Sequence, residues 1–294
     1  MTFETDYYES FWSYGIVDDP SDLKRLEGTA RLIPEGCVNL IDVGCGDGVF
    51  ARIVRQKFPS IQITCVDRSS AALEQVRDAD EKMCCELASL PFDDQSFDCV
   101  SCLEVIEHLT VRDYKNALSE LARIAKNTVI ISVPYNEAIE KEVDTCPQCR
   151  TVFNRDLHLR SFNDSTFAEL LSDFGFRMEE SSIPVVNTHY WGFRTYYSIW
   201  RKLRGVPDRS ELFMSPLCPL CGYTPEKEKQ AQINSTPAQR SAAVSASTSP
   251  RNSKIRGLVK RCWPRQTTPG YWIVGRFTRL QTVARSTSTP AKRS

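Results

Sequence analysis

The sequence has no uninterrupted apolar stretch approaching about 18 residues, so it predicts no membrane-spanning helix. It also lacks the basic region followed by an apolar run that marks a secretory signal peptide, because Met1–Asp19 is acidic and aromatic. No internal repeat is visible. We therefore expect a cytoplasmic protein whose 294 residues, 41% of them apolar, supply one sizeable core with or without an appendage.

Net charge is also lacking, but the zero total hides a strong asymmetry. Pro225–Ser294 holds 14 Lys and Arg against two acids, which leaves 23 basic and 35 acidic residues before it. A basic tail of this kind is either solvated and disordered, or contacts nucleic acid, an anionic membrane surface or the acidic body of the chain. Residues 225–250 are rich in Ser, Thr, Ala, Gln and Pro, which predicts a disordered linker.

Cysteine, in contrast, is abundant, with twelve residues. Cys84 and Cys85 are adjacent, and Cys45, Cys65, Cys99 and Cys102 lie in strand-like contexts. This distribution favours reduced thiols, with a metal site among them, over the disulfide framework of a secreted protein.

Strand and helix patterns alternate from Cys37 onward. We expect strands near 38–43, 61–66, 82–86, 97–103, 127–133 and 176–183, and helices near 49–57, 69–77, 110–125 and 165–174. Such alternation predicts a parallel sheet covered by helices on both faces, with ligands at the carboxyl ends of the strands. Before it, a helix is expected near 21–32, and the aromatic cluster 7–14 either packs on the body or covers a pocket.

The first predicted strand ends in a glycine-rich turn, Asn39–Gly48, whose glycines alternate with other residues. A strand that turns this tightly into a helix is typical of a nucleotide site. Asp67 follows the second strand, where a carboxylate can accept hydrogen bonds from both hydroxyls of a ribose. Gly46-x-Gly48-x-x-Ala51 also fits the dinucleotide fingerprint, so a dinucleotide-dependent oxidoreductase is an alternative.

Two further segments distinguish between the possible cofactors. They are Glu86–Asp98, with Leu90-Pro91-Phe92, and Leu103-Glu104-Val105-Ile106-Glu107-His108-Leu109. Together with the glycine turn, they resemble class I S-adenosylmethionine-dependent methyltransferases, and are most similar to the small-molecule group that includes quinone-biosynthesis enzymes. The resemblance covers roughly Cys37–Ile183. It implies an α/β, Rossmann-like seven-stranded methyltransferase sheet and S-adenosyl-L-methionine as cofactor.

The resemblance also implies roles for individual residues. The methionine part of the cofactor should lie along Gly44 and Gly46, with Asp42 organising their turn, and the Leu103 carbonyl should face its amino group. Asp67 should hold the ribose hydroxyls. Glu86, where the family usually has aspartate, should face the adenine beside the Leu87 backbone.

The implied reaction is an in-line displacement, in which a base is needed only when the acceptor must lose a proton. Glu107, His108, Tyr135 and His158 are the candidate catalytic residues, although the Glu107–His108 pair can also serve only packing. Tyr135 follows Val133-Pro134 rather than standing in the Asn-Pro-Pro-Tyr motif of enzymes that methylate nucleic-acid amino groups, which argues against base methylation.

Four cysteines form two Cys-Pro-x-Cys knuckles, Cys146–Cys149 and Cys218–Cys221. Two residues between thiolates let both reach one tetrahedral ion, so the knuckles predict a structural Zn²⁺ site that is closed and non-catalytic. The alternatives are redox-active or merely buried thiols, or His158 or His189 in place of one cysteine. Resembled enzymes of sugar and polysaccharide biosynthesis carry similar paired knuckles late in the chain.

We therefore predict a methyltransferase acting on a small-molecule or glycan/lipid-precursor acceptor. The alternative from another class is a nucleic-acid-binding zinc-knuckle protein with a degenerate core. The expected divisions are an N-terminal cap (1–36), a core (37–183) with an insertion (134–164), an extension (184–224), a disordered basic linker (225–268), a last strand (269–279) and a disordered tail (280–294). Tyr271–Phe277 should be the last, antiparallel strand, or otherwise an aromatic patch at a membrane surface.

Overall fold

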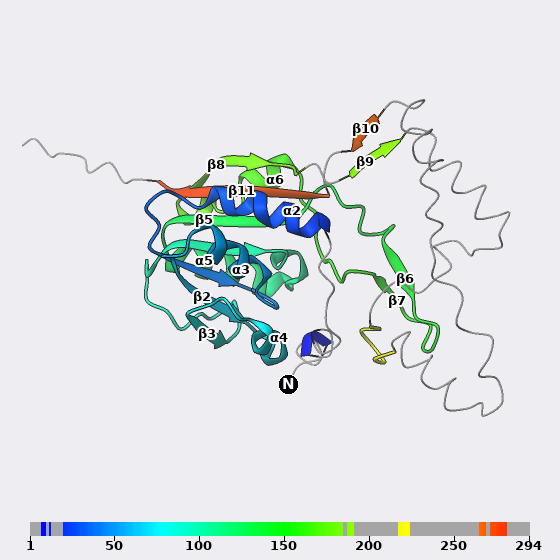
Figure 1. Ribbon diagram of the computed structural model, residues 1–294. Coiled ribbons are helices and arrows are strands. Elements are labelled where there is room, and N and C mark those ends of the chain that lie inside the picture. The colour runs from blue at the N-terminus through cyan, green and yellow to red at the C-terminus, as the bar shows by residue number, and fades with distance from the viewer. Residues whose placement is uncertain are drawn as a thin grey trace, which may run out of the picture.

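The computed structural model describes residues 7–9, 12, 20–184, 187–190, 217–223, 265–268 and 271–280, with the backbone alone for 20–21, 187–190 and 265–268. A seven-stranded sheet in the order β3-β2-β1-β4-β5-β11-β8 forms its centre (Figure 1). The strands are β1 (Asn39–Val43), β2 (Gln62–Asp67), β3 (Glu81–Cys84), β4 (Phe97–Leu103), β5 (Ala125–Pro134), β8 (Phe176–Ser182) and β11 (Trp272–Arg279). β1 to β5 pair in parallel.

β11 lies between β5 and β8 and runs antiparallel to both. It is the last antiparallel strand that we predicted at Tyr271–Phe277. β8 ends at Ser182 and β11 begins at Trp272, so these neighbouring strands are far apart in the sequence. The predicted Rossmann-like sheet is confirmed.

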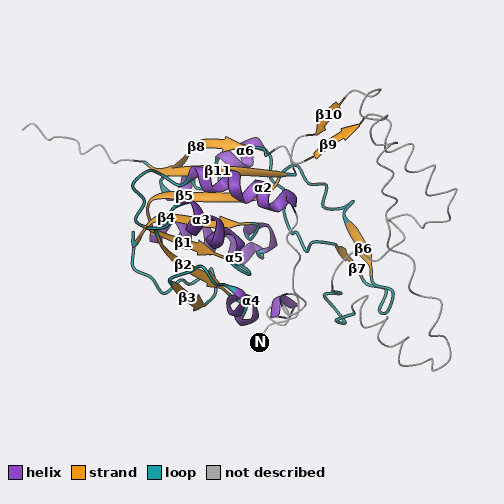
Figure 2. Cartoon of the chain, viewed as in Figure 1, coloured by secondary structure: helices purple, strands orange, loops and turns teal. Residues whose placement is uncertain are grey.

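The helices are α2 (Pro20–Thr29), α3 (Val49–Lys57), α4 (Ser70–Gln75), α5 (Val111–Ile124) and α6 (Asp164–Ala168), with the 3₁₀ turns η1 (Ala30–Leu32), η2 (Ile106–His108) and η3 (Ser172–Phe174) (Figure 2). Ser69 and Thr110 cap α4 and α5 by accepting from backbone N–H groups three residues on. Successive sheet residues bury on opposite faces, as Val129, Ile130 and Ile131 of β5 do. Both faces of the sheet are therefore covered by helices, as predicted.

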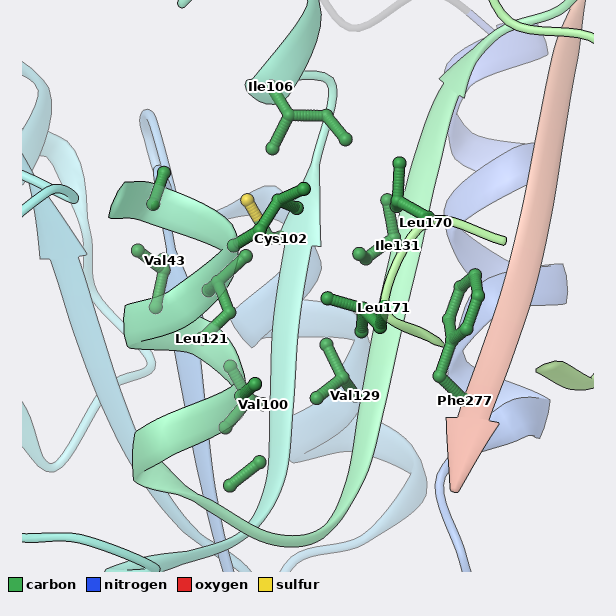
Figure 3. Packing of buried hydrophobic residues seen from close by; sticks show 14 of the residues in the cluster. Val43, Val100, Cys102, Ile106, Leu121, Val129, Ile131, Leu170, Leu171 and Phe277 are labelled. Carbon is green, nitrogen blue, oxygen red and sulfur yellow. The ribbon is translucent and has the colours of Figure 1, made fainter. Parts of the chain in front are cut away.

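The larger core lies between the sheet and α5, α6 and η3. Figure 3 shows Leu121 of α5 against Val100 and Cys102 of β4, and Phe277 of β11 beside Leu171. The second core packs α2, α3 and α4 against the other face. The central strands β1, β2, β4 and β5 are largely buried on both faces, which explains why they read as continuous apolar runs.

Two differences from the predicted elements concern the second half of the chain. The single helix expected at 165–174 is two short pieces, α6 and η3, which end at Gly175 with a φ of 79°. Hydrogen bonds three residues apart, such as Leu170 N to Phe167 O, replace the α-helical spacing between the pieces. Arg265–Thr268, which we assigned to the linker, form β10, which pairs antiparallel with β9 (Asn187–Tyr190).

The predicted insertion carries a small hairpin, β6 (Val143–Thr145) and β7 (Val152–Asn154), with the first cysteine knuckle at its tip. Most of the predicted linker and the predicted tail beyond 280 lie outside the described residues. Within the described part of the chain, no helix combines the length and apolarity needed to cross a membrane.

Candidate functional site

The glycine turn leaves β1 in a conformation that side chains disfavour. Gly44, Gly46 and Gly48 have φ values of 74°, 54° and 82°. A Cβ on Gly44 would collide with the Val105 side chain, and one on Gly46 with Trp12. The turn therefore needs glycine both for its backbone and for its close neighbours.

Two buried aspartates flank this turn, and one of them, Asp67, is hydrogen-bonded to it. Asp67, at the end of β2, accepts from Gly46 N through Oδ2 and from Ser69 N through Oδ1, both at 2.9 Å. Asp42, on β1, accepts from Ser101 Oγ at 2.7 Å. Burial raises the pKa of Asp42 to about 7, and the neighbouring Asp67 carboxylate adds to the rise while Ser101 opposes it. Burial also raises the pKa of Asp67.

A cavity of about 240 Å³ opens between the glycine turn, α2 and the end of β4. Of the predicted cofactor residues, Asp42, Gly44, Gly46 and Leu103 line it. Asp67, Glu86 and Leu87 do not, and the Glu86 carboxylate instead pairs with Arg68 at 3.3 Å. The structure thus brings the expected methionine side together in one cavity and leaves the expected adenosine side outside it.

Arg25 of α2 is a cavity residue that our sequence predictions did not include. Its buried guanidinium donates to Ser132 Oγ at 2.9 Å, lies 3.7 Å from Glu104 and covers the ring of Trp272. Ser132 Oγ in turn donates to Glu104 at 2.7 Å, and burial raises the pKa of Glu104. A single arginine in a predicted helix carries no signal of this long-range role.

Two described members of the N-terminal aromatic cluster, Tyr8 and Trp12, lie over the site, in line with one of our two expectations for the cluster. Trp12 lines the cavity above Gly46, and its carbonyl accepts from Gln75 Nε2 at 2.9 Å. Tyr8 packs edge-on against His108 with ring centroids 6.1 Å apart. These contacts connect the cavity to the next group of polar residues.

Three of the four predicted catalytic residues, Glu107, His108 and His158, lie together beyond the end of β4. Two hydrogen bonds connect their segments: the Leu159 N–H donates to the Glu107 carbonyl, and the Arg160 guanidinium donates to the Ile106 carbonyl. Glu107 is fully buried, and burial raises its pKa well above the usual range. Burial and the neighbouring His158 lower the pKa of His108 to about 3.

Tyr135, the fourth, is engaged elsewhere: its hydroxyl donates to Asp164 at 2.8 Å, and it does not line the cavity. Glu137 was not predicted, yet it makes a 2.5 Å hydrogen bond with His158 Nδ1. A buried acid 21 positions from its partner is invisible to a search of local motifs.

The two cysteine knuckles meet, although 68 residues separate them in sequence. Cys146 Sγ lies 3.6 Å from Cys221 Sγ, and Cys149 Sγ lies 3.7 Å from Cys218 Sγ. Four thiolates at 2.3 Å from one zinc ion would be about 3.8 Å apart, so this spacing fits a tetrahedral ion. None of the cysteines within the described ranges is in a disulfide.

The knuckles also share one backbone pattern. The N–H of the first cysteine donates to the carbonyl five residues on, Thr151 or Tyr223, and its carbonyl accepts from the N–H four residues on. That fourth residue, Arg150 or Gly222, has a φ of 63° or 66°. His189, proposed as a substitute ligand, lies in β9, whose side chains are outside the described residues.

Comparison with known proteins agrees with this architecture. Residues 41–133 match a family described as a methyltransferase domain. An uncharacterised protein of Methanocaldococcus jannaschii is 29% identical over 137 residues, 46% of this chain and 56% of its own length. A protein of Mycobacterium tuberculosis, described as a probable S-adenosylmethionine-dependent methyltransferase, is 30% identical over 141 residues, 47% of this chain and 48% of its own. The chain thus spans about half the length of the curated relatives it matches.

Among solved structures, magnesium protoporphyrin IX methyltransferase of Synechocystis is similar over 60% of this chain and 82% of its own, with 18% identity and a TM-score of 0.44. The segment that matches the methyltransferase family runs from β1 through the glycine turn to β5. Over residues 41–133, the chain carries a methyltransferase domain of the kind found in S-adenosylmethionine-dependent methyltransferases.

Proposed function

We propose that the chain binds S-adenosylmethionine beside the glycine turn and transfers its methyl group to a small-molecule or glycan/lipid-precursor acceptor. The charge pattern of the cavity carries the proposal: four carboxylates and one guanidinium surround the turn, from Asp22, Asp42, Asp47, Glu104 and Arg25. The cofactor has two cationic groups, a sulfonium and an ammonium, and one carboxylate. The cavity therefore offers the complementary charges.

The residues fit the two ends of this cofactor to different degrees. Asp42, Gly44, Gly46 and Leu103 would hold the methionine end, because they line the cavity. Asp67 would hold the ribose, since each of its oxygens keeps a lone pair beyond the backbone bonds that it accepts. For Glu86 and Leu87, the proposed adenine contacts rest on the family resemblance alone.

When bound, S-adenosylmethionine supplies a methyl group carried on a sulfonium. The rest of the cofactor leaves as a neutral thioether once the methyl group has been transferred. The chain has to hold the acceptor in line and, for a protonated acceptor, remove a proton. His158 is the best-placed base of the predicted residues, because Glu137 orients its ring from the Nδ1 side. His108 and Glu107 border it, whereas Tyr135 is occupied by Asp164.

For the acceptor, the support comes from the sequence. Tyr135 follows Val133-Pro134 rather than standing in the motif of amino-methylating nucleic-acid enzymes. The paired knuckles are similar to those of enzymes in sugar and polysaccharide biosynthesis. We further propose that Cys146, Cys149, Cys218 and Cys221 hold a structural Zn²⁺, because their sulfur spacing fits a tetrahedral ion.

Calorimetric titration of the full chain with S-adenosylmethionine tests the binding step. We expect saturable binding, weakened about 10- to 100-fold in Asp67→Ala, because the change removes charge-assisted hydrogen bonds and the support of the Gly46 turn. Asp93→Ala, in an exposed loop, is the matched control and should bind like the original chain. Circular dichroism should confirm that all three proteins are folded.

Three results would reject the proposal: no heat with S-adenosylmethionine, binding of a nicotinamide dinucleotide in its place, or salt-dependent RNA or DNA binding without cofactor binding. Unchanged affinity in Asp67→Ala would remove the ribose role alone. Adding the purified protein and cofactor with a labelled methyl group to a cell extract should then show which class of metabolite gains label.

A further inference from the structure

Glu107, His108 and His158 converge from two separate segments. Glu107 and His108 belong to η2, whereas His158 follows β7, about 50 residues later. One potential ligand atom from each side chain lies within 4.8 Å of the others. The two imidazole rings are 4.8 Å apart between centroids. Such a spacing allows all three groups to contact one ion.

The Glu107 side chain is fully buried, and neither of its oxygens has a hydrogen-bond partner. His108 Nδ1 is buried and unpartnered as well. An isolated carboxylate that is removed from water is strongly destabilising, so natural proteins pair such groups, protonate them or place them on a metal. The surrounding described residues provide no cation within hydrogen-bonding distance of the Glu107 oxygens. The Glu107 carboxyl group and His108 Nδ1 therefore lack hydrogen-bond partners among the described residues.

Glu137 supplies the outer contact that metal-binding histidines usually have. It is buried and accepts from or donates to His158 Nδ1 at 2.5 Å, depending on which group carries the proton. When Nδ1–H donates to the carboxylate, Nε2 keeps its lone pair for an ion. Carboxylate–histidine pairs of this kind fix the tautomer of metal ligands and increase their basicity.

We propose that Glu107, His108 and His158 form a binding site for a first-row divalent transition-metal ion, with Glu137 as its positioning residue. Two imidazoles and one carboxylate suit ions of the Mn²⁺-to-Zn²⁺ series, whereas Mg²⁺ prefers oxygen ligands. Three protein ligands leave open coordination positions, unlike the four-thiolate cluster. The proposal concerns metal binding alone and does not depend on methyl transfer or on cofactor binding. An ion on Nε2 would take the lone pair with which His158 would act as a base, so the two roles exclude each other at that nitrogen.

Manganese distinguishes this site from the cysteine cluster, because thiolates select softer ions. The full chain, first loaded with one equivalent of Zn²⁺ and dialysed, would be titrated with Mn²⁺ while electron paramagnetic resonance measures the free ion. We expect about one bound Mn²⁺ per chain. Glu107→Gln and His158→Asn should each abolish this binding, and Glu137→Gln should weaken it about 10- to 100-fold. Exposed Glu140→Gln should leave it unchanged.

Absence of Mn²⁺ binding to the unmodified chain would overturn the proposal, and this measurement needs no variant to fold. Binding that survives in a folded Glu107→Gln protein would overturn it equally. Glu107→Gln is nearly isosteric and removes a buried unpaired acid, so its thermal unfolding without metal should match or exceed that of the original chain. Mn²⁺ should then raise the melting temperature of the original chain but not that of the variant.

Discussion

Among single residues, Asp42 links the electrostatics of the cavity to pH. Its pKa of about 7 lies well above the 3.8 of an unperturbed aspartic acid, chiefly because of burial. The folded chain therefore binds this proton more tightly than the unfolded chain does. Between about pH 4 and 7, Asp42 makes stability fall as pH rises, and below that window it has no effect on pH dependence.

A cation bound in the cavity should reverse this preference, because it favours the carboxylate. Cofactor binding would then release a proton, and affinity for S-adenosylmethionine should rise about 3- to 10-fold from about pH 6 to 8. Calorimetry across this range should show a smaller rise of affinity with pH in Asp42→Asn than in the original chain. Asp93→Asn is the control and should keep the full rise. The cofactor's own amino group also titrates, but it affects all three proteins equally and cancels in the comparison. An identical pH slope in Asp42→Asn and the control would contradict the assignment.

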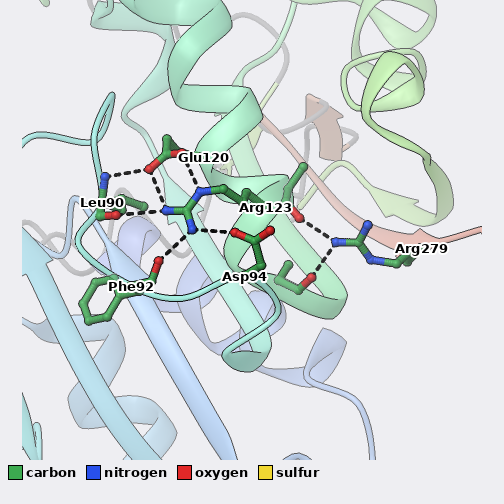
Figure 4. A network of polar contacts seen from close by, with 8 residues as sticks. Leu90, Phe92, Asp94, Glu120, Arg123 and Arg279 are labelled. Carbon is green, nitrogen blue, oxygen red and sulfur yellow. Dashed lines mark hydrogen bonds and ion pairs between the residues drawn. The ribbon is translucent and has the colours of Figure 1, made fainter.

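At the level of elements, one arginine of α5 fixes the segment that precedes β4. Arg123 donates to the carbonyls of Leu90 and Phe92 at 2.9 and 2.7 Å and pairs with Asp94 and Glu120 (Figure 4). Arg279 of β11 binds carbonyls at the end of the same helix. Two guanidinium groups thus attach α5 to a loop and to the last strand.

We expect Arg123→Ala to reduce the free energy of unfolding by about 2 kcal/mol, because it leaves two carbonyls and two carboxylates without their charged donor. Urea denaturation measures the change, with exposed Arg112→Ala on the same helix as control, expected within about 0.5 kcal/mol of the original chain. Hydrogen exchange should locate the loosened amides in 86–96. Equal losses in both variants would show that the network contributes nothing specific.

Elements with strong local signals were predicted closely. Residues 49–57 and 97–103 match α3 and β4 at both ends, and the cap at Thr110 is present, because each depends on neighbouring residues. The break between α6 and η3 was missed, since three-residue and four-residue spacing bury the same apolar side chains. Sequence patterns indicate a helical face, but they do not resolve which hydrogen bonds build it.

On the scale of the whole molecule, the site depends on contacts between distant segments. Motifs located the glycine turn and the Glu107–His108 pair, because each is a short local pattern. Arg25 and Glu137 could not be found in this way, since their roles come from partners 107 and 21 positions away. The cysteine knuckles were an exception, because their spacing predicts a shared ion whatever the chain between them does.

These knuckles join the β6–β7 hairpin to residues 217–223, so metal should tie two distant segments together. We expect about one zinc per chain by elemental analysis, lost in Cys146→Ser/Cys149→Ser. Exposed Cys84→Ser is the matched control and should retain it. The double variant, or a strong chelator, should expose both knuckle segments to limited proteolysis, because removal of a structural zinc forfeits about 10 kcal/mol or more of binding free energy. A core far from the hairpin should resist cleavage in all proteins. If the original chain contains no metal and its knuckle segments still resist proteolysis, the zinc prediction is wrong. Packing of the thiols would then be what links the two segments.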